Sequence, residues 1–280
     1  MKSKPNCKIN LGLHVVAKRA DGYHNIETIF MPIGLCDELE IEKSSELRFW
    51  QEGIEVDCAA EENICIKAYR MMQQDFGQIG QITMNLRKNI PFGAGLGGGS
   101  SDGAFTIKML NELYELGMSD DAMQQYAARL GADCTFFIGN QTSYAYGIGN
   151  KLEPIVGGKE LMRQLSGKTR VVVKPEAKVS TADAYRGIVP KRPTVDLREA
   201  IRQPIEEWRN LIVNDFEKTV FAKYPEIKTL KKELYNRGAL YASMSGSGSA
   251  LFALFDGNPM EEMPYEIYRC SGDYLLPYFG

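Results

Sequence analysis

The chain of 280 residues has few of the side chains that bind transition metals. It contains only two histidines, which form no His-x-x-x-His pair, and its six cysteines lack paired spacing. Zinc sites and disulfide frameworks both depend on such spacing, so the sequence favours neither of them. Unpaired cysteines suit a reducing compartment, and we therefore expect a cytoplasmic protein without a protein-bound metal cluster. The cysteines are Cys7, Cys36, Cys58, Cys65, Cys134 and Cys270.

Long apolar runs and a strong net charge are also absent. No run reaches the ~18 apolar residues that a membrane-spanning helix requires, and residues 1–5 are not followed by the apolar segment of a secretory signal. The formal net charge is −3 and no basic stripe is present, so nothing attracts the chain to nucleic acid or anionic lipid. We expect neither nucleic acid nor a membrane as a partner, and an anionic substrate must be bound by local groups.

Glycine, by contrast, is concentrated in one place, with five glycines among residues 93–99. Such a backbone adopts conformations closed to other residues and can approach a ligand closely. A strand-like segment over 82–86 precedes the run, and an apolar-periodic helix beginning near Phe105 follows, with serine and aspartate available as its N-cap. Helix N-terminal amides and the helix dipole then favour an anion, for which a nucleotide phosphate is the expected candidate. The predicted phosphate loop consists of Pro91, Phe92, Gly93, Ala94, Gly95, Leu96, Gly97, Gly98, Gly99, Ser100 and Ser101.

Three other interpretations of this loop fit less well. A flexible Gly/Ser linker joins polar tracts, whereas this run joins a strand to an amphipathic helix. Gly93, Gly95 and Gly98 satisfy the dinucleotide-binding pattern, but that pattern also needs a second strand that ends in an acidic residue. Here Glu112 and Glu115 fall inside a predicted helix instead. A P-loop is excluded because no Gly-Lys-Ser/Thr closes the run.

The rest of the chain predicts a mixture of strands and helices in α+β order. Expected strands cover 9–16, 26–32, 38–42, 82–86, 136–138, 143–146, 170–174 and 250–255, the first of them half-buried. Helical segments are expected within 63–75, 105–113, 124–130, 182–188, 195–201 and 216–237. The character changes near 153–168, where Gly157–Gly158 and Ser166–Gly167 flank a polar stretch. We therefore predict two packed lobes, formed by residues 1–155 and 156–280.

The loop resembles the phosphate-binding motif of the GHMP kinases, Pro-x-x-x-Gly-Leu-Gly-Ser/Gly-Ser/Gly-Ser/Ala. Its triple glycine followed by Ser100-Ser101-Asp102 is most similar to the branch that phosphorylates a cytidylated methylerythritol in non-mevalonate isoprenoid synthesis. The resemblance covers nearly the whole chain. It implies an N-terminal lobe like ribosomal protein S5 domain 2, a ferredoxin-like C-terminal lobe, and a site between them. It further implies a kinase that uses ATP and Mg²⁺ on a small cytidylated substrate, as a monomer or homodimer.

Two charged residues gain a catalytic role from this resemblance. Lys8 stands in Pro-x-x-Lys-Ile-Asn-Leu, and Asp133 stands in Gly-Ala-Asp after a predicted helix end. Without the resemblance, a lysine near the chain start is usually a solvated surface group, and Asp133 reads as a turn aspartate. The family pattern implies that Asp133 is the base that takes a proton from the substrate hydroxyl and that Lys8 polarises that hydroxyl.

The predicted substrate-binding residues are Asn10, Tyr23, His24, Thr181 and Tyr185. Asn10 shares its strand face with Lys8, because side chains two apart point the same way. The run from Arg19 to His24 reads alone as a hairpin turn; the resemblance implies that Tyr23 stacks on cytosine and His24 hydrogen-bonds to it. Tyr185 would form the opposite wall, although a packed helix aromatic is an equally good interpretation.

Two further motifs and two other functions complete the sequence-based predictions. The segment 245–249 resembles the superfamily motif that braces the phosphate loop, and residues 214–217 recur in these enzymes without an assigned chemical role. Another small-molecule GHMP kinase, of the homoserine or mevalonate type, lacks the Arg-x-Asp-Gly-Tyr-His element. A non-catalytic nucleotide-sensing relative could lose its base, whereas this chain keeps both Lys8 and Asp133.

Overall fold

A computed structural model describes residues 1–55, 59–155, 158–257 and 266–270. Within these residues the strands form three four-stranded sheets, two of them in separate halves of the molecule and one between the halves. The mixed α+β fold is confirmed. Among the described helices, none has both the length and the apolar character that crossing a bilayer would demand.

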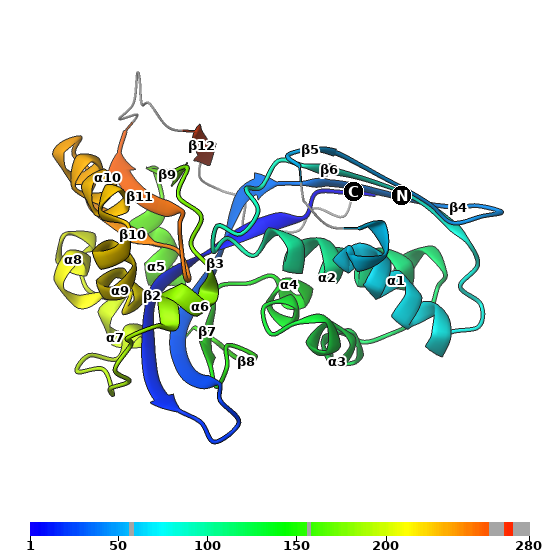
Figure 1. Cartoon of the computed structure of the whole chain (residues 1–280), viewed down its shortest axis with the longest axis horizontal. Coiled ribbons are helices and arrows are strands. Elements are labelled where there is room, and N and C mark those ends of the chain that lie inside the picture. The colour runs from blue at the N-terminus through cyan, green and yellow to red at the C-terminus, as the bar shows by residue number, and fades with distance from the viewer. Residues whose placement is uncertain (56–58, 156–157, 258–265, 271–280) are drawn as a thin grey trace.

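A long antiparallel hairpin joins the two halves (Figure 1). It consists of β2 (Asn6–Lys18) and β3 (His24–Cys36), and β7 (Ser143–Tyr146) and β8 (Lys151–Pro154) extend its sheet in the order β2-β3-β7-β8. The prediction of a half-buried first strand is wrong, because residues 7–15 are buried on both faces of β2. The polar side chains of β2 are therefore enclosed between the halves, where they need hydrogen-bond partners.

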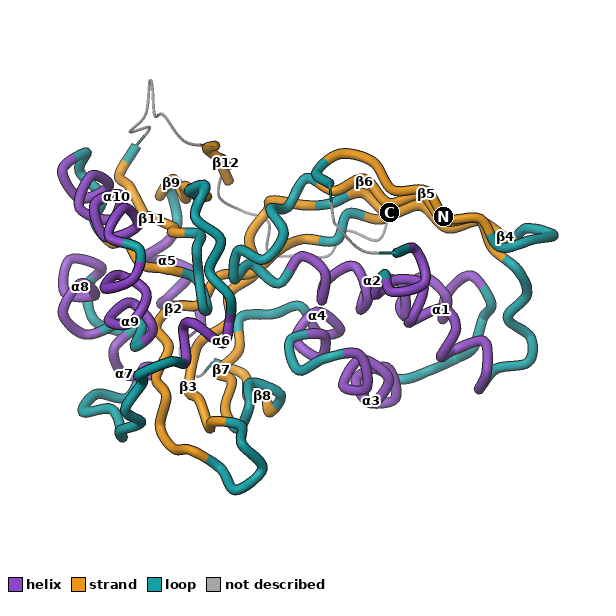
Figure 2. Tube along the Cα trace, in the orientation of Figure 1, coloured by secondary structure: helices purple, strands orange, loops and turns teal. Residues whose placement is uncertain are grey.

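The first half packs four helices on one face of a sheet (Figure 2). Its strands are β1 (Lys2–Ser3), β4 (Glu38–Lys43), β5 (Arg48–Gly53) and β6 (Ile82–Lys88), in the order β1-β4-β6-β5. Its helices are α1 (Ile64–Asp75), α2 (Gly98–Leu113), α3 (Asp120–Leu130) and α4 (Cys134–Gly139), with a 3₁₀ turn at Ala60–Glu62. Apolar side chains of both layers form one core, which stabilises the half by removing them from water.

The second half is an antiparallel sheet with its own helices. Its strands are β9 (Lys168–Lys174), β10 (Tyr241–Met244), β11 (Leu251–Asp256) and β12 (Glu266–Cys270), in the order β10-β11-β9-β12. The helices are α5 (Gly158–Leu165), α6 (Thr181–Tyr185), α7 (Leu197–Ala200), α8 (Trp208–Leu211), α9 (Phe216–Lys223) and α10 (Pro225–Asn236), with a 3₁₀ turn at Ile205–Glu207. Proline at the first position of α10 separates it from α9.

Two local predictions are wrong, each for a physical reason. Residues 136–138 lie in helix α4, because a short, fully buried apolar run has no periodicity that separates helix from strand. The polar stretch within 158–168, for which no element was predicted, holds the amphipathic helix α5, whose Leu161 and Leu165 are buried in the core. Helix α2 begins inside the glycine run, with Gly97 as its N-cap in the left-handed region and not with a serine cap. The predicted boundary after residue 155 adjoins residues 156–157, including Gly157, which lie outside the described residues.

Candidate active site

The glycine run forms a loop that only glycine can build. Gly93, Gly95 and Gly97 have φ angles of +64°, +78° and +72°, in the left-handed region that other residues rarely adopt. At Gly95 a Cβ atom would lie 2.0 Å from the carbonyl oxygen of Ser245. The loop therefore depends on glycine both for its turns and for its close approach to the second half.

This loop and the start of α2 line a cavity of about 380 Å³. The cavity has the size of a small-ligand site, and the first turn of the 16-residue helix α2 belongs to its wall. Its lining residues are Gln51, Glu62, Asn63, Ile64, Leu86, Lys88, Ile90, Pro91, Phe92, Gly93, Ala94, Gly95, Leu96, Gly97, Gly98, Gly99, Ser100 and Asp102. Ten of the eleven predicted phosphate-loop residues are among them. Ser101 is not, because it is fully buried.

Lys8 and Asp133 are brought together beside the loop. The Lys8 side chain is buried, and its Nζ lies 3.5 Å from Asp133 Oδ2, while the Asp133 side chain stays 35% exposed. Lys8 also donates to the Gly95 carbonyl at 3.1 Å and to Asn10 Oδ1 at 2.7 Å. The ammonium thus links the phosphate loop to a carboxylate that an outside molecule can reach. Asn10 is only 1% exposed, so its contact with a substrate stays a prediction.

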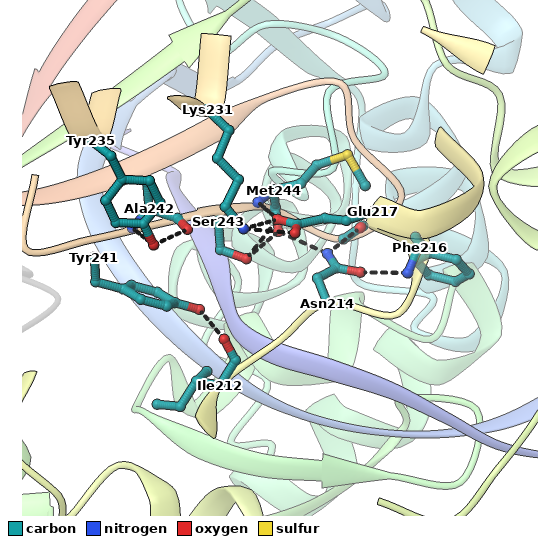
Figure 3. Close-up of polar contacts among 11 residues, drawn as sticks. Ile212, Asn214, Phe216, Glu217, Lys231, Tyr235, Tyr241, Ala242, Ser243 and Met244 are labelled. Carbon is teal, nitrogen blue, oxygen red and sulfur yellow. Dashed lines mark hydrogen bonds and ion pairs between the residues drawn. The ribbon is translucent and has the colours of Figure 1, made fainter. Parts of the chain in front are cut away.

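The turn after β10 supports the loop from the second half. Ser245 Oγ donates to the Gly95 carbonyl at 2.9 Å, and the Ala250 amide donates to the Ala94 carbonyl at 3.1 Å. Asn214 holds this turn in place, since its Nδ2 donates to the carbonyls of Met244 and Gly246 at 2.8 and 2.9 Å (Figure 3). The contacts of this turn agree with the predicted bracing role of segment 245–249.

Glu217 fixes the same turn from α9. Its carboxylate accepts from Lys231 Nζ at 2.6 Å, from Ser243 Oγ at 3.2 Å and from the Met244 amide at 2.9 Å (Figure 3). A carboxylate with several donors is a satisfied structural group. Residues 214–217, which had no assigned role, therefore hold the strand end that contacts the phosphate loop.

An aromatic group lies at the far end of the β2–β3 hairpin. Arg19 and Asp21 form a bidentate ion pair in its turn, and Tyr23 follows with 63% of its surface exposed. His24 stacks on Tyr185 of α6 with ring centroids 4.7 Å apart. Burial raises the pKa of the Tyr185 hydroxyl, and the Asp133 charge raises it further. The stack joins the far end of the hairpin to α6 of the second half.

Thr181, the last predicted substrate-binding residue, is exposed at the start of α6. Its hydroxyl lies 3.4 Å from Ser247 Oγ, in the turn that braces the phosphate loop. Sequence reasoning missed Gly149, where a Cβ atom would lie 3.3 Å from Ile26 and 3.9 Å from Asp133 Oδ1. A glycine that keeps space open beside a carboxylate carries no signal in a single sequence.

A buried charge cluster that the sequence did not indicate ties the two ends of the loop together. Lys88, at the end of β6, donates to Asp102 of α2 at 2.6 Å and to Asp37. Asp37 also accepts from the amides of Asn89 and Ile90, at 2.6 and 2.8 Å. Burial raises the pKa of the Asp102 carboxyl well above its usual value against the attraction of Lys88, and the Asp37 charge adds to the rise.

The cavity has the size of a small-ligand site, and the described residues form no cluster of metal ligands there. Open left-handed glycines and a helix N-terminus fit the phosphates, and Ile64, Leu86 and Ile90 offer an apolar wall. Across the described ranges, no three His, Cys, Asp or Glu side chains gather as metal ligands. Mg²⁺ commonly keeps waters and phosphate oxygens as ligands, so a nucleotide could bring it without such a cluster.

Comparison with known proteins defines the class. The family model of the GHMP kinase N-terminal domain matches residues 63–147, and that of the GHMP kinase C-terminal domain matches residues 197–269. A Bacteroides fragilis protein is 48% identical over 271 residues, which cover 95% of this chain and 96% of that protein. The chain belongs to the GHMP kinases, and it is an ATP-dependent small-molecule kinase. That relative is named 4-diphosphocytidyl-2-C-methyl-D-erythritol kinase, and this chain is a member of its family within the superfamily.

Solved structures agree with this assignment. A crystal structure of 4-(cytidine 5'-diphospho)-2C-methyl-D-erythritol kinase is 32% identical, with a TM-score of 0.78 over 91% of this chain and 90% of that chain. The mevalonate kinase of Methanococcus jannaschii is 16% identical, with a TM-score of 0.71 over 96% of this chain and 97% of that chain. The second match supports the fold alone. The predicted two-lobed GHMP kinase fold is confirmed.

Proposed function

We propose that the chain transfers the γ-phosphate of ATP to a hydroxyl of 4-diphosphocytidyl-2-C-methyl-D-erythritol and so forms the 2-phosphate. This reaction belongs to non-mevalonate isoprenoid precursor synthesis. The observation that carries the chemistry is the Lys8–Asp133 pair, 3.5 Å apart, beside a glycine loop. The named relatives and the hairpin carrying Tyr23 and His24 support the choice of substrate.

Asp133 is the proposed base. As the substrate oxygen bonds to the γ-phosphorus, its proton passes to an Asp133 carboxylate oxygen and the bond to the ADP leaving group breaks. Asp133 suits this role because its carboxylate is partly exposed while Lys8 fixes it from the buried side. Lys8 places a positive charge where the hydroxyl loses its proton, which lowers the energy of the developing alkoxide.

The phosphate loop is the proposed binding site of the ATP triphosphate. Main-chain amides of residues 92–100, which include the start of α2, would hold its oxygens, since Gly93, Gly95 and Gly97 expose the backbone. Mg²⁺ would accompany the nucleotide and neutralise the charge on its β- and γ-phosphates. Alignment of the two substrates supplies most of the rate in this proposal.

The exposed Tyr23 ring and the His24–Tyr185 pair are the proposed cytosine site. A pyrimidine needs a flat apolar surface and a polar edge, and stacking on an aromatic ring contributes ~1–3 kcal/mol. Tyr23 offers an exposed ring, and His24 lies next to it on β3. Thr181 and Asn10 stay predicted contacts of the substrate.

Asp133→Asn tests the proposal, because it keeps the shape of the side chain and removes the base. We expect kcat to fall by about 10²- to 10⁴-fold, while ADP still binds with wild-type affinity in calorimetry. Asp121→Asn, at the exposed start of α3, controls for the loss of one carboxylate. Wild-type turnover by the Asp133 variant would refute the assigned base. ADP release measured with a panel of alcohols, including homoserine and mevalonate, tests the substrate separately.

A further inference from the structure

Thr28 is linked through Asn10 to the Lys8–Asp133 pair, although no sequence motif singled it out. It is fully buried on β3, where it pairs with Leu13 of β2. The register of the two strands shifts between Leu11 and Leu13, so Gly12 has no partner strand residue. Gly12 has a φ of +73°, and its carbonyl accepts a hydrogen bond from Thr28 Oγ1 at 2.5 Å. The bulge therefore supplies an acceptor that the regular ladder would have used.

Thr28 also contacts Asn10, whose Nδ2 lies 2.9 Å from Thr28 Oγ1. A hydroxyl has one proton, and the Gly12 carbonyl can only accept it. The hydroxyl must therefore accept from Asn10, which turns the NH₂ group of that amide toward Thr28. The carbonyl oxygen of Asn10 then faces Lys8 Nζ, at 2.7 Å. An ammonium group can only donate, so the same orientation is required from this end as well.

The result is a chain of hydrogen bonds with one direction. Lys8 donates to Asn10, Asn10 to Thr28, and Thr28 to Gly12. Asn10 and the Gly95 carbonyl take two of the three protons of Lys8 Nζ, and the remaining donor is available to Asp133. All members of this chain are buried, so no water can replace a lost partner without a cavity.

We propose that Thr28 is a positioning residue, which fixes the amide of Asn10 and thereby aims the Lys8 ammonium at Asp133. The inference rests on the proposed roles of Lys8 and Asp133. Thr28 does not touch substrate or nucleotide in this arrangement. Its removal takes away the acceptor of the Asn10 NH₂ group, and the orientation of the amide then depends on the contacts of its oxygen with Lys8 Nζ at 2.7 Å and Ser245 Oγ at 3.4 Å. A rotated amide presents NH₂ to an ammonium, which repels it. The Lys8 ammonium is then no longer held in its orientation toward Asp133, while the phosphate loop keeps its contacts with Ser245.

The test compares Thr28→Val and Thr28→Ser. Valine has nearly the same shape without the hydroxyl, and serine keeps the hydroxyl. We expect Thr28→Val to lower kcat by about 10- to 100-fold, the range that follows from a small misplacement of a reacting group. The KM for ATP should stay unchanged, and Thr28→Ser should recover most of kcat. Thr106→Val is the matched control, because the hydroxyl of this buried threonine bonds to the Asp102 carbonyl within α2 and to Cys65 of α1.

A double-mutant cycle separates positioning from simple loss of stability. In a Lys8→Met background, Thr28→Val should cause no further fall in kcat, because the group that it positions is gone. An equal fall in both backgrounds would show that Thr28 acts independently of Lys8 and would overturn the inference, as would wild-type kcat in Thr28→Val. Where the valine variant does not fold, Thr28→Ala against Thr28→Ser measures the same hydroxyl. Wild-type kcat in Lys8→Met alone would instead refute the proposed function, and the positioning role with it.

Discussion

At the scale of single residues, Gly95 shows why the phosphate loop tolerates so few residue types. Its carbonyl accepts from both Lys8 and Ser245, so one backbone group joins the Lys8–Asp133 pair to the second half. Its missing Cβ lets the two backbones meet. The turn therefore needs glycine for contact as well as for conformation.

Gly95→Ala should lower the thermal stability of the protein more than Gly93→Ala does. Both positions are left-handed, which costs an L-residue about 1–2 kcal/mol. Only at Gly95 would the new methyl group meet a main-chain oxygen, whereas nothing lies within 4 Å at Gly93. Thermal melting should thus rank wild type above Gly93→Ala and Gly93→Ala above Gly95→Ala, and ADP binding should be weakest in the last. Equal melting temperatures for the two variants would contradict this account.

Single residues also show which parts of the candidate site could be predicted from the sequence and which could not. Lys8 and Asp133 follow from the motifs around them, and the structure brings them together. Thr28 could not be predicted, because its contact with Asn10 depends on the pairing of two strands and on a bulge at Gly12. Strand register depends on which residues of two distant segments pair. An alternating pattern in the sequence predicts the face of the sheet on which a side chain lies, but not the residue that it pairs with.

At the scale of elements, β6 and α2 act as the two stems of the phosphate loop. Lys88 is the last residue of β6 and Asp102 lies near the start of α2, and Asp37 bonds both to Lys88 and to the amide of Asn89, where the chain enters the loop. Removing one partner of a buried ion pair leaves an uncompensated charge, which costs about 3–5 kcal/mol. The cluster therefore holds the loop ends at a fixed separation.

Asp102→Asn should change how stability depends on pH. Burial raises the pKa of Asp102 in the folded protein, so the folded state holds this proton more tightly than the unfolded chain. That contribution to stability is complete below the unfolded pKa of about 3.8 and is lost as pH rises through the raised value. The wild type should therefore lose stability relative to the variant over this range in urea unfolding. Parallel pH curves would contradict the effect, and the exposed Asp120→Asn controls for charge.

Most elements could be predicted, and α4 and α5 show where the local pattern does not decide the structure. Alternation and caps located β3, β4, β6 and α1, where Asn63 caps the helix by accepting from the Cys65 amide. Helix α4 was predicted as a strand because its apolar side chains are buried all round. In α5, the buried Leu161 and Leu165 decide the structure although polar residues dominate the composition.

At the scale of the whole molecule, the β2–β3 hairpin is the element that both halves share (Figure 1). Its body carries Lys8 and Thr28, and its far end carries Tyr23 and His24. The His24–Tyr185 stack connects that end to α6 of the second half. The order of strands in the three sheets was not predictable, because pairing between distant segments leaves no local pattern.

His24→Ala should separate recognition of the substrate from recognition of the nucleotide. The loss of the ring removes a hydrogen-bonding edge and the stacking partner of Tyr185. We expect the KM for the cytidylated alcohol to rise by about tenfold or more, with ADP affinity in calorimetry unchanged. His14→Ala is not a suitable control, since that ring is buried against Asp215; Asn25→Ala, next to His24 on β3, serves instead. An equal loss for both ligands would argue against a cytosine site.

The continuous hairpin has one more consequence for the proposed reaction. Because Lys8 and His24 stand on the same pair of hydrogen-bonded strands, the separation between these two side chains is set by the strands, whereas Asp133 and Tyr185 are carried by α4 and α6. In the proposed reaction, this fixed separation would favour a substrate whose cytidine and reacting hydroxyl lie the same distance apart. The length of the diphosphate bridge between cytidine and alcohol would thus be selected by the backbone itself.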